Sequence, residues 1–159
     1  MKSKENKFIV GSRLTNLVEA CLQGSSEANK TDDLTAAFLT AAMINDLPAL
    51  DIMLDQGVDI DFQDQTGSTA LMEATFGGHI DAVRLLIDRG ADVNLTNCDG
   101  WTPLMEACSK GYAEIARILI SSGANVKSED KSGWTALKLV PKRQVKLARL
   151  LNQFYCAVN

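Results

Sequence analysis

One histidine and a pair of glutamates are the only residues in this chain that suggest acid–base chemistry. His79 is the single histidine, so any Ser/His/Asp or Cys/His triad would have to include it. Glu73 and Glu106 stand 33 residues apart, and paired carboxylates can serve as an acid and a base. Here we expect the two glutamates to line a solvated surface instead. We therefore predict no catalytic residues and no enzymatic activity.

Metal and cofactor sites are not predicted either. The four cysteines, Cys21, Cys98, Cys108 and Cys156, form no C-x-x-C pair and have no metal-ligand spacing. Cys21 and Cys108 fall on apolar helical faces, where free core thiols are common. Cys98 falls at a predicted turn tip. Gly77-Gly78 lacks the spacing of a phosphate-binding loop, and we read it as the end of a helix.

An internal repeat sets the positions of these residues. When residues 64–96 are written above residues 97–129, 13 of the 33 columns are identical. Self-similarity at a fixed period is the signature of a stacked repeat. The identical columns include Thr69/Thr102, Leu71/Leu104, Glu73/Glu106, Gly78/Gly111 and Gly90/Gly123.

Each repeat predicts two short helices. Thr69 and Thr102 precede apolar runs, so their hydroxyls can cap a helix N-terminus. Gly78 and Gly111 can end that helix, because glycine accepts the left-handed conformation at little cost. A second helix follows at helical spacing. Its apolar positions are Val83, Leu86 and Ile87 in one repeat and Ala116, Leu119 and Ile120 in the next.

These lines resemble ankyrin repeats, which have 33 residues, a turn and two antiparallel helices with a Thr-Pro-Leu-His start. The starts here read Thr69-Ala70-Leu71-Met72 and Thr102-Pro103-Leu104-Met105, so methionine replaces the family's histidine. The resemblance implies an all-α solenoid of helix-turn-helix pairs joined by short turns or hairpins. It also implies a structural role for His79, because the family commonly has Gly-His at the turn between the helices.

The same frame divides residues 31–159 into four repeats, at about 31–63, 64–96, 97–129 and 130–159. The first repeat is degenerate, with a helix expected over residues 34–44 and Asn45-Asp46 in place of the glycine turn. In the fourth repeat, Pro141 should end the first helix early. The second helix is reached by deleting one residue, and this basic repeat is expected to form the C-terminal cap.

Residues 1–30 are expected to be a polar N-terminus with an amphipathic helix at about 13–23. We expect this helix to cap the first apolar face of the solenoid. The alternative is a helix that binds a partner elsewhere. Residues 24–30 are predicted to be a linker.

The net charge of −4 is uneven: +2 over residues 1–30, −11 over residues 31–126 and +5 over residues 127–159. The acidic middle argues against nucleic-acid binding by the whole surface. No apolar run approaches the roughly 18 residues that a membrane span needs. We therefore expect a cytoplasmic protein that does not enter a membrane, and we expect a monomer.

The resemblance implies a module that binds another protein through turn tips and the exposed side of the first helices. Trp101 and Trp134 occupy the same column, and exposed aromatic rings make good anchors. Alternatively, a tryptophan in this column packs flat over the neighbouring turn. The predicted partner-binding residues are Met43, Gln65, Ser68, Phe76, Asp99, Trp101, Lys110 and Trp134.

Three alternatives remain open. An anionic partner or nucleic acid could bind the basic C-terminal repeat, whose charges could equally form a soluble cap. The protein could also be an inhibitor or a regulatory subunit of an enzyme. Asp92-Val93-Asn94 resembles ankyrin sites that are modified by an asparaginyl hydroxylase, although the same columns are family consensus. The basic residues of the C-terminal repeat, which would bind the anionic partner, are Lys138, Lys142, Arg143, Lys146 and Arg149.

Overall fold

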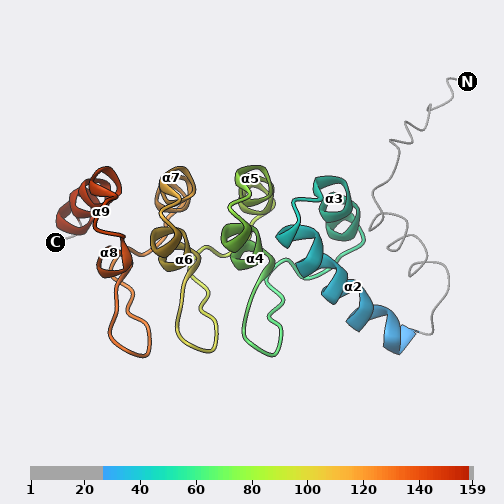
Figure 1. Ribbon diagram of the computed structural model, residues 1–159. Helices are drawn as coiled ribbons and strands as arrows, with labels where there is room; N and C mark the ends of the chain where they lie inside the picture. Colours follow the sequence, from blue (N-terminus) through green and yellow to red (C-terminus); the bar gives the residue numbers. More distant parts are fainter. Residues whose placement is uncertain (1–26, 158–159) are drawn as a thin grey trace, which may run out of the picture.

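The computed structural model describes residues 27–157, which form pairs of helices stacked side by side (Figure 1). Successive helices along the chain pair with one another. The amphipathic helix expected at about 13–23 lies outside the described residues. The pairs are α2 (Glu27–Met43) with α3 (Leu47–Asp55), α4 (Ala70–Gly77) with α5 (Ile80–Asp88), α6 (Pro103–Lys110) with α7 (Ala113–Ser121), and α8 (Ala136–Leu139) with α9 (Val145–Ala157).

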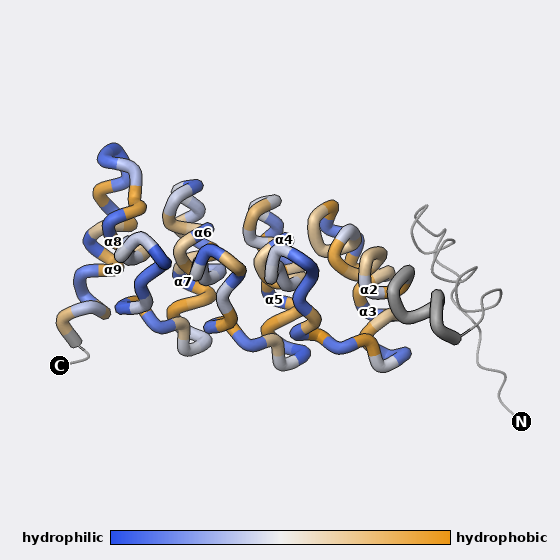
Figure 2. The backbone as a smooth tube through the Cα atoms, turned by 90° about the horizontal axis from the view of Figure 1, so that it is seen from below, coloured by the Kyte–Doolittle hydropathy of each residue, from blue (hydrophilic) through white to orange (hydrophobic). Residues whose placement is uncertain are grey.

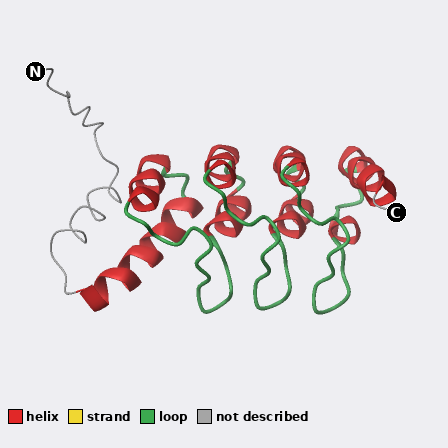
Figure 3. Cartoon of the chain, turned by 180° about the vertical axis from the view of Figure 1, so that it is seen from behind, coloured by secondary structure: helices red, strands yellow, loops and turns green. Residues whose placement is uncertain are grey.

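The helices form two rows, with α2, α4, α6 and α8 in the first row and α3, α5, α7 and α9 in the second (Figure 1). The loops before α4, α6 and α8 project from the first row on the same side (Figure 3). The predicted all-α solenoid is therefore confirmed. Among the described residues, no helix is long and apolar enough to cross a membrane.

The core lies between successive helix pairs. Leu71, Ala74, Leu104 and Ala107, the inward positions of α4 and α6, are almost completely buried. Figure 2 shows hydrophobic stretches within the stacked helices and hydrophilic stretches in the loops between them. Burying one leucine contributes about 1.5–3 kcal/mol. Because a single pair has too little apolar surface to cover itself, each pair depends on its neighbours.

Threonine and glycine define the ends of the first helices as predicted. Thr69 Oγ1 accepts a hydrogen bond from the Met72 amide at 3.3 Å, and Thr102 Oγ1 accepts one from the Met105 amide at 3.2 Å. At the other end, Gly78 is left-handed, with φ of 75°. The sequence columns therefore fix where these helices begin and end.

The first repeat departs from the prediction at its start. Its helix α2 begins at Glu27, so residues 27–30 are helical and not a linker. These residues include no glycine or proline, and Glu, Ala and Lys favour helices. At the other end, Asn45 takes the place of the turn glycine with φ of 62°. Asparagine tolerates this left-handed conformation better than most residues.

Pro141 shortens the first helix of the fourth repeat, as predicted. Helix α8 has 4 residues, whereas α4 and α6 have 8 each. Val140 is extended, with φ of −62° and ψ of 125°, because a residue before proline is driven out of the helical region. Helix α9 then buries Leu147 and Leu151 against the stack.

The loops before α4, α6 and α8 fold back as tight hairpins that bond to one another. The Cys98 amide donates to the Thr66 carbonyl at 2.8 Å, and the Lys131 amide donates to the Asp99 carbonyl at 3.0 Å. Each donor lies in the hairpin that follows its acceptor's hairpin in the chain. The hairpins therefore form one continuous edge of the molecule.

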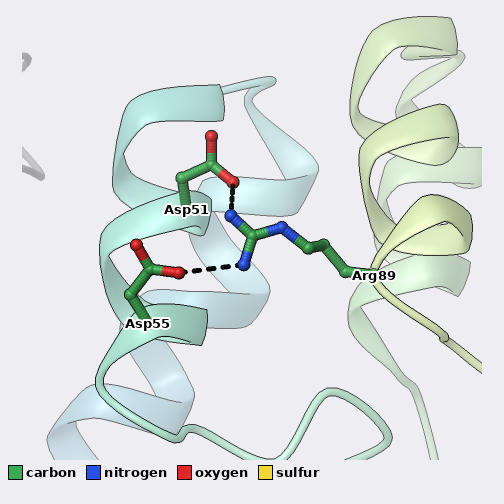
Figure 4. A network of polar contacts seen from close by, with 3 residues as sticks. All are labelled: Asp51, Asp55 and Arg89. Atoms are coloured by element: carbon green, nitrogen blue, oxygen red, sulfur yellow. Dashed lines mark hydrogen bonds and ion pairs between the residues drawn. The ribbon is translucent and has the colours of Figure 1, made fainter.

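Charged groups join the first two repeats on the row of second helices. Arg89 reaches from the end of α5 to α3, where its guanidinium contacts Asp51 at 2.7 Å and Asp55 at 2.9 Å (Figure 4). One repeat further along, Arg84 pairs with Glu114 at 3.3 Å. These pairs are solvent-exposed, so they favour the register of the stack more than they add to its stability.

Candidate functional site

Two adjoining cavities lie along the first row of helices, where these helices meet the hairpins. One has a volume of about 270 Å³ and lies between α4, α6 and their hairpins. The other, of about 620 Å³, lies between α2 and α4. Glu73 lines both, and we call the two cavities together the inner groove. Its lining includes Leu39, Met43, Phe62, Asp64, Gln65, Ser68, Glu73, Phe76, Trp101 and Glu106.

Five of the eight predicted partner-binding residues line the inner groove. They are Met43, Gln65, Ser68, Phe76 and Trp101. The apolar side chains of Met43 and Phe76 are 44% and 52% exposed, so the groove has large apolar groups on its wall that no other part of the described chain fully covers. The other three, Asp99, Lys110 and Trp134, are exposed but do not line either cavity.

The two tryptophans of the shared column have different environments. Trp101 is half-buried, and its indole Nε1 donates a hydrogen bond to Asp130 Oδ2 of the next hairpin at 3.1 Å. This is the packing over a neighbouring turn that the sequence left open. Trp134 has no later hairpin to pack against in the described part of the chain, and its side chain is 48% exposed.

Two carboxylates of the inner groove are half-buried. Burial raises the pKa of Glu73, and the negative charges of Asp64 and Glu106 raise it further, against a hydrogen bond with Ser68. Burial also raises the pKa of Glu106, against the attraction of Lys110. We had expected these glutamates to lie on a solvated surface. Their equal repeat position indicated that they are neighbours, but nothing in the sequence indicated their partial burial.

An aromatic ring and an ammonium group meet beside the groove. Lys110 Nζ lies 3.9 Å from the centre of the Phe76 ring, in a cation–π contact. The same ammonium lies 4.0 Å from Glu106 Oε1. Lys110 therefore binds to an aromatic face and a carboxylate that both belong to the wall of the groove.

His79 has a structural position, as the resemblance implied. Its Nε2 lies 2.8 Å from the Met43 carbonyl oxygen, which joins the turn after α4 to the end of α2. The ring also covers Gly77, where an added Cβ would lie 2.5 Å from His79 Cδ2. Among residues 27–157, no three His, Cys, Asp or Glu side chains gather as metal ligands would.

The cysteines in the described residues are free thiols. Cys108 is buried, and burial raises its pKa to about 12. A thiol that stays protonated at neutral pH is a poor nucleophile. We therefore assign Cys108 a packing role in the core and no chemical role. Cys98 and Cys156 are exposed. Cys21 lies outside the described residues.

The basic residues of the fourth repeat spread over several elements. Lys138 belongs to α8, and its ammonium donates to the Gly133 carbonyl at 2.8 Å. Lys142 and Arg143 are exposed in the turn that follows, and Lys146 and Arg149 are exposed on α9. None of these side chains lines the inner groove.

Asn94 links the second repeat to the third. Its Oδ1 accepts a hydrogen bond from the Asn125 amide at 2.8 Å, and its Nδ2 donates to the Gly123 carbonyl at 3.1 Å. The side-chain amide thus has a structural role in this conformation. A hydroxylase would have to reach an asparagine that is exposed but bonded on both sides.

The sequence was compared with models of known protein families and with curated proteins. A family model for ankyrin repeats, in three copies, matches residues 9–97 and 90–158 of the chain. A search among curated proteins finds no match.

Proposed function

The chain belongs to the ankyrin-repeat family, and from this premise we propose that it binds its partner protein through the inner groove and the hairpin tips beside it. Ankyrin repeats are generally protein–protein interaction modules and are typically non-catalytic. The observation that carries the location is the exposure of Met43 and Phe76 on the groove wall. Large apolar side chains that stay exposed beside a groove are characteristic of interaction sites.

The frame around these side chains is already ordered. Met43 ends α2, where its carbonyl is held by His79, and Phe76 lies near the end of α4. The hairpins are held by the amide–carbonyl bonds that join one hairpin to the next. A partner that binds such a surface loses little free energy to ordering it, which favours affinity.

The predicted partner-binding residues divide into two groups under this proposal. Met43, Gln65, Ser68 and Phe76 contact the partner inside the groove, and Asp99, Lys110 and Trp134 contact it around the rim. Trp101 shapes the groove wall while it holds the next hairpin. We further propose that the protein acts as a monomer in the cytosol, a setting that suits its free exposed thiols at Cys98 and Cys156.

Quantitative capture of proteins from native lysate tests the proposal. The Phe76→Ser variant and the Trp134→Ser variant remove exposed apolar area without touching the core. We expect each to reduce the amount of specifically captured partner several-fold, because exposed aromatic anchors carry much of the binding free energy at interfaces.

The matched controls are Arg84→Ser and Arg117→Ser, which change exposed residues of α5 and α7 in the second row. These variants should capture as much partner as the parent. If the second-row variants lose the partner while Phe76→Ser and Trp134→Ser retain it, the binding surface lies on the other side and the proposal is wrong.

A further inference from the structure

The second and third repeats each have a glutamate at the same repeat position, but they differ in whether a nearby cation neutralises it. In the third repeat Glu106 has Lys110 four residues later, and the two charges lie 4.0 Å apart on α6. In the second repeat the same two columns hold Glu73 and Gly77. One repeat therefore supplies its own cation to this position, and the other does not.

The structure explains why the second repeat has no lysine in this column. A Cβ at Gly77 would lie 2.5 Å from His79 Cδ2 and 3.0 Å from the Met43 carbonyl oxygen. The histidine ring, bonded to that carbonyl at 2.8 Å, occupies the space that a side chain would need. The contact that joins α2 to the second repeat thus leaves no room for a cationic side chain at position 77, the column that supplies Lys110 in the third repeat.

Glu73 consequently faces mostly negative charge. It has no ion pair among the residues that the structure describes. Asp64 on the hairpin and Glu106 on α6 both raise its pKa, and the Lys110 ammonium lies near Glu106. Of the described groups that act on Glu73, the hydrogen bond with Ser68 is the one that favours the ionised form. A half-buried carboxylate in such surroundings gains more from an added cation than a solvated one does.

We propose that the partner supplies this cation: an arginine or lysine of the partner protein lies in the inner groove with its charged group against Glu73. The inference rests on the proposed function and names the chemistry of its ligand. Two observations favour it besides the position of Glu73. Residues 31–126, which build the groove, carry a net charge of −11. Lys110 already shows that an ammonium binds to Phe76 and a carboxylate on this wall.

The larger cavity suits the apolar stem of an arginine or lysine side chain. Leu39, Met43 and Phe62 provide apolar lining, and Asp64 and Glu73 provide the carboxylates. Arginine and lysine both have an apolar stem with a charged end, so they can contact the apolar wall and reach Glu73 together. Arginine suits the site better, because its planar guanidinium can donate two hydrogen bonds to one carboxylate.

The test is a selection of random short peptides, displayed on phage, against the full chain. We expect the enriched peptides to contain an arginine or lysine beside an apolar residue. Binding of the best peptide should weaken about tenfold in Glu73→Gln, the loss expected when a charge-assisted hydrogen bond is removed. Glu106→Gln should weaken it much less, because Lys110 already neutralises Glu106. The exposed Glu114→Gln, at a glutamate paired with Arg84, should not change it.

Replacing the peptide's arginine by citrulline, a neutral side chain of the same shape, should give about the same tenfold loss on the unaltered protein. This arm does not depend on the folding of any variant. Enriched peptides without a basic residue, or full binding by Glu73→Gln or by the citrulline peptide, would overturn the inference. If the inference failed in one of these ways but the enriched peptides still lost binding to Phe76→Ser, the proposed function would stand without the inference. If no peptide were enriched, or Phe76→Ser retained full binding, both would fail.

Discussion

At the scale of single residues, positions that are equivalent in sequence have different roles because their neighbours differ. Trp101 and Trp134 share a column, and in the part of the chain that the structure describes Trp101 bonds to a following hairpin whereas Trp134 does not. Glu73 and Glu106 share another, but only Glu106 has a lysine one turn later. In the described part of the chain Trp134 and Glu73 lack such neighbours, and we therefore expect them to be the side chains most available to a partner.

The raised pKa of Glu73 makes stability depend on pH. A carboxyl whose pKa lies above the unfolded value of 4.5 destabilises the folded state when it is ionised. This penalty is absent below the unfolded pKa and develops as the pH rises through the raised folded pKa. The groups that face Glu73 are Asp64, Glu106, Ser68 and, beside Glu106, Lys110.

We therefore expect Glu73→Gln to gain stability relative to the parent as the pH rises from about 4 to about 7. Urea unfolding of both proteins at several pH values measures the difference in free energy. Glu114→Gln is the control, since Glu114 lies on an exposed surface. A difference between Glu73→Gln and the parent that stays constant or falls with rising pH would contradict the account.

The two tryptophans should also separate in stability. Trp101→Ala removes a half-buried ring and its hydrogen bond to Asp130, so we expect a loss of about 1–3 kcal/mol. Trp134→Ala changes an exposed ring and should alter stability by no more than about 0.5 kcal/mol. Urea denaturation of the two single variants measures both values. Equal losses would show that the two rings have the same structural role.

At the scale of elements, the sequence predicted most helix ends because local rules decide them. The threonine caps and the left-handed glycines lie where the repeat columns predict, and α8 ends early as Pro141 predicts. The start of α2 was missed because residues 27–30 have no strong boundary signal, and helix propensity extends the helix through them.

The inner groove was only partly predictable at this scale. The repeat columns and the family resemblance selected Met43, Phe76 and Trp101. The half-buried state of Glu73 depends on how α2, α4, α6 and two hairpins close around it, which no single repeat specifies. The absence of a lysine beside it at position 77 depends on the position of the His79 ring, which fills the space that a side chain there would need.

A side chain in the turn after α4 should destabilise the protein. Gly78 has φ of 75°, and an added Cβ would lie 2.9 Å from a ring carbon of Tyr112. Gly57 has φ of 84° but nothing within 4 Å of such a Cβ. We expect Gly57→Ala to cost about 1–2 kcal/mol from the left-handed backbone alone. Gly78→Ala should cost more, because the Tyr112 ring must also move.

Thermal unfolding followed by circular dichroism compares these two glycine variants directly. The account requires a lower melting midpoint for Gly78→Ala than for Gly57→Ala. If the two midpoints were equal, the stacking of Tyr112 on the preceding turn would contribute nothing to the contact between these repeats.

At the scale of the whole molecule, the helix pairs depend on one another. Leu104 is completely buried in α6, between the second and fourth repeats. Leu104→Asp would bury an unpaired charge there. The free energy that this costs is larger than the contribution of any single interaction to the stability of an ordinary domain. We expect loss of the helical circular dichroism signal throughout the chain. A melting midpoint like that of the parent would refute the stacked core.

The central claim for the whole molecule is that the partner lies against the first row of helices, over the inner groove. Photo-crosslinking from single positions tests it most directly, with benzophenone-bearing residues placed at Phe76 in the first row and at Arg84 in the second. Both positions are exposed, so neither substitution disturbs the core. The account predicts that position 76 crosslinks the partner and position 84 does not; crosslinking from position 84 alone would contradict it.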